Sequence, residues 1–139
     1  AGGVTNASIV GNISSAGFQA NVAPAIVSTP VNSVGFLGLP QNSQSSNYTL
    51  VIGDAGKHVF ISATANVTIP ANSSVPFPIG TTVTFVANTG ASSNILITTD
   101  TMYLAGTGTT GTRQLAAYGM ATAVKVAQST WFINGTGLT

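Results

Sequence analysis

The chain has 139 residues, of which only 4% are charged and 44% are hydrophobic. Three cations and two anions give a formal net charge of +1, and the sequence contains no Cys. These values exclude a basic surface for phosphates, a highly charged disordered chain and a disulfide framework. Because the chain has no basic face, nucleic acid is not an expected partner. No apolar run approaches the roughly 18–20 residues of a membrane span, so a membrane is not an expected partner either.

Neutral side chains supply most of the polarity of this chain. An average soluble domain has about 25% charged residues, whereas Ser, Thr, Asn, Gln and Gly take their place here. A surface of this kind gives little long-range repulsion, so a free monomer would tend to self-associate at high concentration. The composition therefore favours a subunit of an assembly over a freely diffusing enzyme.

Residues 1–45 form the first of two regions that the sequence predicts. They contain three prolines, six glycines and no charged residue. Prolines hold themselves and the preceding residues in extended conformations, so we expect an extended N-terminal arm with room for two short edge strands. A disordered tail is the alternative, but such tails seldom carry this many apolar side chains without charge. The apolar residues that we expect to make assembly contacts are Phe18, Ile26, Val27, Phe36, Leu37 and Leu39.

Residues 46–139 form the second region, a compact head. From about Asn47, short runs rich in Val, Ile, Thr and aromatic residues alternate apolar and polar side chains, and turn residues separate them. No window shows a long apolar stripe at helical spacing. We therefore expect an all-β fold, with a β-sandwich or jelly-roll-like head of about nine short strands after the arm. The expected strands are residues 48–52, 57–63, 66–69, 81–87, 94–98, 102–104, 114–117, 121–127 and 131–133.

Several of these strands are apolar on both faces. Phe60 stands beside Val59 and Ile61, and Val86 follows Phe85. Strands of this kind are usually covered on both sides, and a domain of this size has little chain left to do so. A second copy of the chain is a reasonable cover, so we expect a homo-oligomer.

Catalytic chemistry has few residues to work with in this sequence. One His, two Asp and neither Glu nor Cys remove most acid–base and nucleophile arrangements by count. Asp54 lies in the turn cluster 53–56 and Asp100 at a strand end, where both are expected to stabilise turns by bonding backbone amides. His58 is expected to be an ordinary strand residue. We predict a protein that is not an enzyme, with no catalytic residue, no metal site and no cofactor.

Residues 106–111 match the G-x-G-x-x-G string of dinucleotide-binding proteins. That fingerprint also needs a helix after the glycines and an acidic residue about 20 positions further on. No Asp or Glu follows Asp100, and the next glycine leaves too little room for the helix. The string therefore predicts a Gly/Thr-rich loop between two strands. Trp131, in the last expected strand, is expected to pack in the core or in an interface.

Four segments of the sequence resemble a β module that recurs in virion proteins of tailed bacteriophages, and a fifth, residues 34–42, resembles the lead-in that often precedes this module. They follow one another in the order of that module and together cover about residues 34–139. The segments are residues 34–42 (VGFLGLPQN), 47–58 (NYTLVIGDAGKH), 68–81 (TIPANSSVPFPIGT), 104–113 (LAGTGTTGTR) and 131–139 (WFINGTGLT). In that family the module occurs on fibre-like tail proteins and on small head-surface proteins.

The resemblance implies a virion structural protein with no catalytic residues to carry over. We expect a capsid decoration or cement protein that binds the outer surface of a bacteriophage head and stabilises it. A fibre usually carries a long shaft before its tip, and only about 45 residues precede the module here, which favours decoration. The alternative is a tail-fibre or head-fibre component that contacts host surface glycans.

The implied partners are the major capsid protein and further copies of the chain itself. For the homo-oligomer, the resemblance favours a trimer over a dimer. A host surface glycan is a third candidate partner. The expected location is the virion, on the outer capsid surface in preference to the tail.

Overall fold

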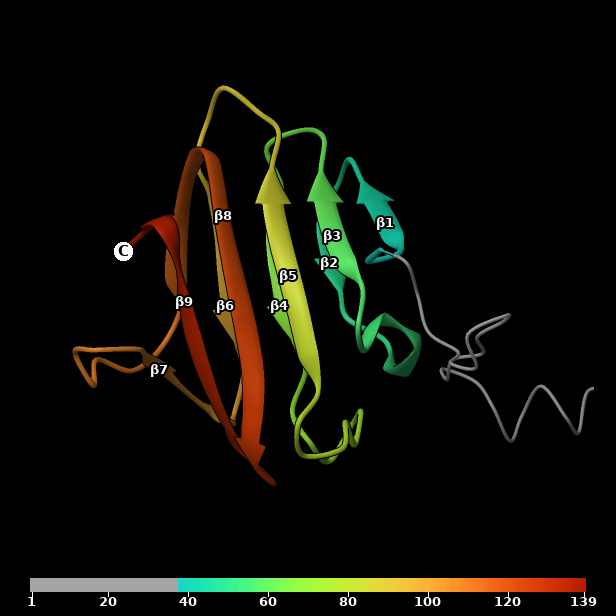
Figure 1. The fold of residues 1–139 in the computed structure, drawn as a ribbon, viewed down its shortest axis with the longest axis vertical. Helices are drawn as coiled ribbons and strands as arrows, with labels where there is room; N and C mark the ends of the chain where they lie inside the picture. Colours follow the sequence, from blue (N-terminus) through green and yellow to red (C-terminus); the bar gives the residue numbers. More distant parts are fainter. Residues whose placement is uncertain (1–37) are drawn as a thin grey trace, which may run out of the picture. The chain divides into compact units, whose positions relative to one another are not determined.

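The computed structural model describes residues 38–139, which Figure 1 shows as a coloured ribbon. The folded unit comprises Leu39–Thr139. Most of the predicted arm lies outside the described residues, and with it the expected assembly contacts Phe18, Ile26, Val27, Phe36 and Leu37. Within residues 38–139 no helix is long and apolar enough to cross a membrane.

The described chain is all-β, as the sequence predicts, and its nine strands belong to one mixed sheet. Within residues 38–139 the only helical element is a short 3-10 turn, η1 (Ile52–Asp54). The strands are β1 (Gln41–Gln44), β2 (Tyr48–Thr49), β3 (His58–Ile61), β4 (Val67–Ile69), β5 (Thr82–Ala87), β6 (Ser93–Ile97), β7 (Thr101–Leu104), β8 (Arg113–Ala127) and β9 (Thr130–Leu138).

The structure has the predicted number of nine strands, but two differences cancel: β1 was not among the expected strands, and two expected strands form one. β1 lies within the segment that the sequence assigns to the arm, and it pairs in parallel with β3. Its Asn42 stands on the same face as the buried Val59 and donates to Asp54, so β1 lacks the apolar alternation of the other strands. The expected strands 114–117 and 121–127 form the single strand β8, because the residues between them continue it through a bend.

Parallel pairing dominates the sheet. β1, β3 and β5 are parallel neighbours in one half, and β2, β4 and β6 are parallel neighbours in the other. Consecutive strands alternate between the halves, so the chain winds round the core and adds one strand to each half per turn. Figure 1 shows this winding, with β3 and β5 in front of β2 and β4. The sheet is nearly closed and barrel-like, whereas a jelly roll is built from antiparallel strands.

β8 joins the two halves of the sheet. Its first part pairs antiparallel with β6, and its last part pairs antiparallel with β5. Between these parts the register against β9 shifts, and Tyr118 has a positive φ of 59°. A Cβ atom on Gly135, which pairs with Ala121, would lie 2.1 Å from the carbonyl oxygen of Met120, so only glycine fits at this bend.

The two halves enclose one hydrophobic core. Buried residues alternate with half-buried ones along β3 and β5, in the period-two pattern that the sequence shows. Trp131 is fully buried and meets Phe77 edge to face, with ring centroids 5.8 Å apart, which confirms its expected packing in the core. Other large buried side chains are Phe85, Leu50, Ile61, Ile69, Ile95, Met102 and Leu115.

Candidate interaction surface

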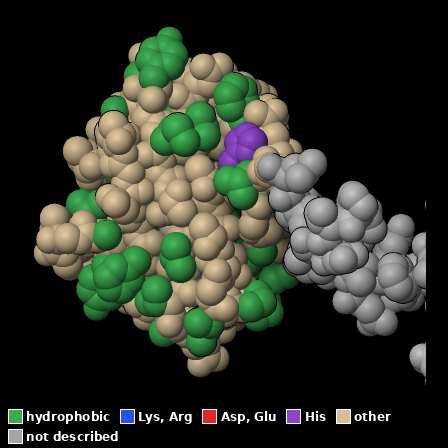
Figure 2. Space-filling model, in the orientation of Figure 1, with side chains coloured by type: hydrophobic (Ala, Val, Ile, Leu, Met, Phe, Trp, Pro, Cys, Tyr) green, Lys and Arg blue, Asp and Glu red, His purple; other side chains and the backbone are tan. Residues whose placement is uncertain are grey.

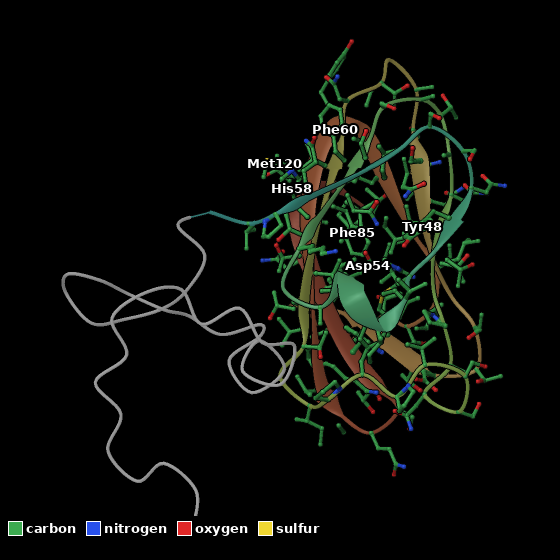
Figure 3. All side chains as sticks on the ribbon, turned by 90° about the vertical axis from the view of Figure 1, so that its right-hand side faces the viewer. Tyr48, Asp54, His58, Phe60, Phe85 and Met120 are labelled. Carbon is green, nitrogen blue, oxygen red and sulfur yellow. The ribbon has the colours of Figure 1, made fainter. Side chains whose placement is uncertain are left out.

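Asp54 is buried at the end of η1, where it holds this connection to the sheet. Its side chain is 1% exposed and accepts hydrogen bonds from Asn42 Nδ2, the Tyr48 hydroxyl and the Val51 amide, each 2.8 Å long. Figure 3 shows Asp54 inside the fold on the side of Tyr48. Both carboxylate oxygens are engaged, so Asp54 has the turn-stabilising role that the sequence predicts.

The contact with Asp54 also affects the acidity of Tyr48. Burial of the phenol is the main cause, and the hydrogen bond to Asp54 adds to it, so the pKa of Tyr48 lies above its usual value of 10.0. The neighbouring Asn42 side chain acts in the opposite direction. At neutral pH the hydroxyl therefore stays protonated and remains a donor to Asp54.

His58 lies on β3 with a half-buried imidazole ring. Its Nδ1 is 3.0 Å from the carbonyl oxygen of Leu39, and its Nε2 is 3.2 Å from Nε2 of Gln41. On this hydrogen-bond pattern the neutral ring is assigned as donating from Nδ1 and accepting from Gln41 at Nε2. His58 is thus a strand residue that fastens the start of the folded unit to β3.

The barrel also holds a buried lysine that the sequence analysis missed. Lys125 is 1% exposed, and its Nζ donates to Asn72 Oδ1 at 2.6 Å and to the carbonyl oxygen of Phe77 at 2.9 Å. The ammonium lies 5.8 Å from the centre of the Trp131 ring, within the range of a cation–π contact. These contacts tie the connection between β4 and β5 to β8. The signal was present in the sequence, because Lys125 has the same strand parity as the inward-facing Ala123.

Asp100 also holds the connection between β4 and β5, through the backbone of Asn72. Its Oδ2 accepts a hydrogen bond from the backbone amide of Asn72 at 3.0 Å, which agrees with its expected role at a turn. Asp54, His58 and Asp100 bond different parts of the chain and do not share a partner. Within residues 38–139, no group of three or more His, Cys, Asp and Glu side chains is placed to hold a metal ion.

The glycine string at residues 106–111 forms the connection between β7 and β8. Gly106, Gly108 and Gly111 have positive φ values of 85°, 71° and 103°. β8 follows in the place where a dinucleotide fingerprint would need a helix N-terminus. The loop between two strands that the sequence predicts is therefore confirmed.

The outward side chains of β3, β5, β8, β9 and β7 form a continuous surface that we call the outer face. Strand pairing aligns these side chains in three rows across the sheet. The first apolar row is Phe60, Val86 and Met120. The polar row is His58, Thr84, Thr122 and Asn134. The second apolar row is Val124, Phe132 and Tyr103.

Both apolar rows of the outer face meet solvent. Met120 is 53% exposed and Phe132 is 42% exposed, while Phe60 and Val86 are half-buried. Phe132 also stacks at a tilt on Tyr103, with ring centroids 5.2 Å apart. β3 and β5 are therefore apolar on both faces, as the sequence indicates, with one face in the core and the other at the surface.

The polar row separates the two apolar rows. The hydroxyl oxygens of Thr84 and Thr122 are 3.1 Å apart and share a hydrogen bond across the sheet. A shallow depression lies beside this row, and Ala105, Thr122, Val124, Phe132, Ile133 and Asn134 line it. The outer face is therefore not flat, and its polar and apolar side chains follow an ordered pattern.

None of the three rows contains a charged side chain. Figure 2 views the outer face and shows hydrophobic side chains in green and the histidine in purple, without the colours of Lys, Arg, Asp or Glu. Charged ligands find no counter-charge on such a surface. The arrangement suits contact with another uncharged surface.

Of the expected assembly contacts, the structure describes only Leu39. Its side chain is 54% exposed, and its carbonyl oxygen contacts His58 at the edge of the polar row. The residues of the outer face were not among the expected assembly contacts, although the two-faced strands at Phe60 and Val86 led to the expectation that a second copy covers them.

No protein-family model matches this chain, and no curated protein sequence is significantly similar to it.

Proposed function

We propose that this chain is a bacteriophage virion structural protein that decorates the outer surface of the capsid and stabilises it. The outer face is the observation that carries the proposal, because its three uncharged rows suit a subunit that is packed against neighbours in an assembly. The buried Asp54 and Lys125 are engaged in holding connections of the fold. The resemblance of about residues 34–139 to the β module of phage virion proteins supports the same class of function.

We further propose that the arm attaches and the head is displayed. In this arrangement the head is a sandwich-like body, with the β1–β3–β5 half packed across the core on the β2–β4–β6 half. Each large apolar side chain of the arm would contribute roughly 1.5–3 kcal/mol on full burial against a capsid subunit. The proposed attachment residues are Phe18, Ile26, Val27, Phe36, Leu37 and the exposed Leu39.

A decoration protein that binds the assembled shell and not the free subunits stabilises the shell by mass action. Quantitative mass spectrometry of purified virions tests this role. Decoration predicts a copy number in fixed proportion to the capsid subunits, and particles stripped of the protein should break at a lower temperature. A copy number of a few per particle, confined to the tail, would contradict the proposal.

Deletion of residues 1–33 tests the division between arm and head. We expect the truncated protein to keep the β-type circular dichroism of the folded unit and to lose binding to capsids. Substitutions at exposed positions of the loops at residues 72–78 and 106–111, such as Ser73 and Ser74, serve as controls, and capsid binding should survive them. Full occupancy of capsids by the truncated protein would move the attachment surface into the head.

One observation favours the alternative of a fibre component that contacts host glycans. Sugar rings stack on exposed aromatic faces, and the Tyr103–Phe132 pair lies on the outer face beside the depression. Tyr118, which is 73% exposed, adds another aromatic ring at the bend of β8. Under this alternative, Tyr118→Ala or changes in residues 106–111 should reduce adsorption to host cells.

A further inference from the structure

We propose that the outer face is the surface through which copies of this chain associate with one another. This inference rests on the proposed structural function, and it names a second copy of the chain as the partner that binds the outer face. Three properties of the outer face support a second copy as the occupant: its apolar rows, its polar row and its lack of charge.

The apolar rows supply the driving force for association. Phe60 pairs with Val86, and Val86 pairs with Met120, so the first row crosses three adjacent strands without interruption. Phe132 extends the second row and is 42% exposed, while Met120 is 53% exposed. Covering these side chains removes apolar surface from water, which favours association. The inner faces of the same strands are already filled by the core.

The polar row can meet its own copy without leaving a polar group unpaired. The hydroxyls of Thr84 and Thr122 and the amide of Asn134 each both donate and accept hydrogen bonds. Two copies of such a row satisfy each other in more than one register. A row of lysines or carboxylates would instead place donors against donors or acceptors against acceptors.

The distribution of charge favours self-association over a charged partner. In a symmetric assembly the same patch recurs in every contact, so a charge near the symmetry axis lies close to its own copies. All five charged residues of the chain are among the described residues, and none stands in the three rows. These residues are Asp54, Lys57, Asp100, Arg113 and Lys125. Asp54 and Lys125 are buried, and Arg113 bonds the backbone of the loop before β8.

Sedimentation equilibrium of the full chain over a wide micromolar range tests the proposal. We expect a mass that is a multiple of the 13.8 kDa protomer. Met120→Lys and Phe132→Lys should each raise the dissociation constant at least about 30-fold, because each places an unpaired charge in the buried contact. Met120→Thr, which shortens the side chain without adding charge, should weaken association to a smaller extent.

Ile52→Lys is the matched control for Met120→Lys. Ile52 is 53% exposed, the same fraction as Met120, but it lies on η1 and not in the three rows. Ile79→Lys, in the connection between β4 and β5, is a second control at a side chain that is 67% exposed. Both controls should associate like the unsubstituted chain, and circular dichroism should show the same β content in all variants.

Several outcomes would overturn the proposal. One is a full chain that sediments as a monomer at every concentration. A second is that the folded variants Met120→Lys and Phe132→Lys associate as well as the unsubstituted chain, which would place the contact elsewhere. A third is that Ile52→Lys weakens association as much as Met120→Lys does, which would lead to the same conclusion. Capsid binding is scored separately. Self-association through the outer face without capsid binding would contradict the proposed function alone, whereas a monomer that decorates capsids would contradict this inference alone.

Discussion

The two faces of the sheet formed by β3, β5 and β8 are both apolar, but they are composed differently. On the inner face, apolar residues such as Val59 and Phe85 follow one another across the strands and are fully buried, and the hydrogen-bonded Lys125 is the charged exception. On the outer face, a row of His, Thr and Asn separates two apolar rows that remain partly exposed. The inner face is thus a nearly continuous apolar surface that fills the core, whereas the outer face alternates apolar and polar rows, the pattern on which we base the proposed contact between copies.

The largest expected effect distinguishes two phenylalanines on adjacent strands, both labelled in Figure 3. Phe85→Ala should lower the free energy of unfolding by about 3–5 kcal/mol, because it leaves a cavity in a filled core. Phe60→Ala should cost about 1 kcal/mol in the monomer, since its ring is only half-buried. Urea unfolding at a concentration that keeps the chain monomeric measures both values. Equal losses would show that the outer face contributes to folding as the core does.

A smaller effect is expected at the charged exception on the inner face. Lys125→Met keeps a long apolar stem but removes the ammonium, so Asn72 Oδ1 and the Phe77 carbonyl oxygen lose their donor. We expect a loss of about 1–3 kcal/mol in the free energy of unfolding. Lys57→Met is the control at a partly exposed lysine, and its effect should stay within about 0.5 kcal/mol. A neutral Lys125→Met would mean that the ammonium contributes little to holding the β4–β5 connection.

The smallest expected effect concerns Tyr48, whose pKa is raised by burial and by its bond to Asp54. Above pH 10.0, the usual pKa of tyrosine, the unfolded chain releases the phenolic proton while the folded chain retains it. This contribution to stability is complete below that pH and is lost as the pH rises through the folded-state pKa. Urea titrations at several alkaline pH values should show a steeper fall for the unsubstituted chain than for Tyr48→Phe. Identical pH profiles would contradict the raised pKa.

Local side-chain patterns explain which elements the sequence predicted. β3 and β5 carry an apolar residue at every second position because one face of each strand fills the core, and this period of two is visible without a structure. Trp131, the turn at Asp54 and the glycine loop at 106–111 were predicted for similarly local reasons. Each depends on the chemistry of a few consecutive residues.

Long-range pairing explains what the sequence did not reveal. Parallel and antiparallel strands have the same side-chain period, so alternation says nothing about the winding of the chain between the two halves. β1 is polar because Asn42 meets Asp54, a partner that only the fold brings to it. The outer face depends on the register of strands as distant in the chain as Phe60 and Met120, which sequence alone does not fix.

The position of β8 has a consequence for how the domain folds. β8 pairs with β5, β6 and β9, and it follows β1 to β6 in the chain, so neither half of the sheet can be joined to the other before β8 is in place. Such long-range contacts slow folding into the millisecond-to-second range typical of non-local β topologies. They also couple the halves, so we expect both to form and to melt in one cooperative transition. During synthesis, the edges of β5 and β6 that pair with β8 would stay unpaired until β8 leaves the ribosome.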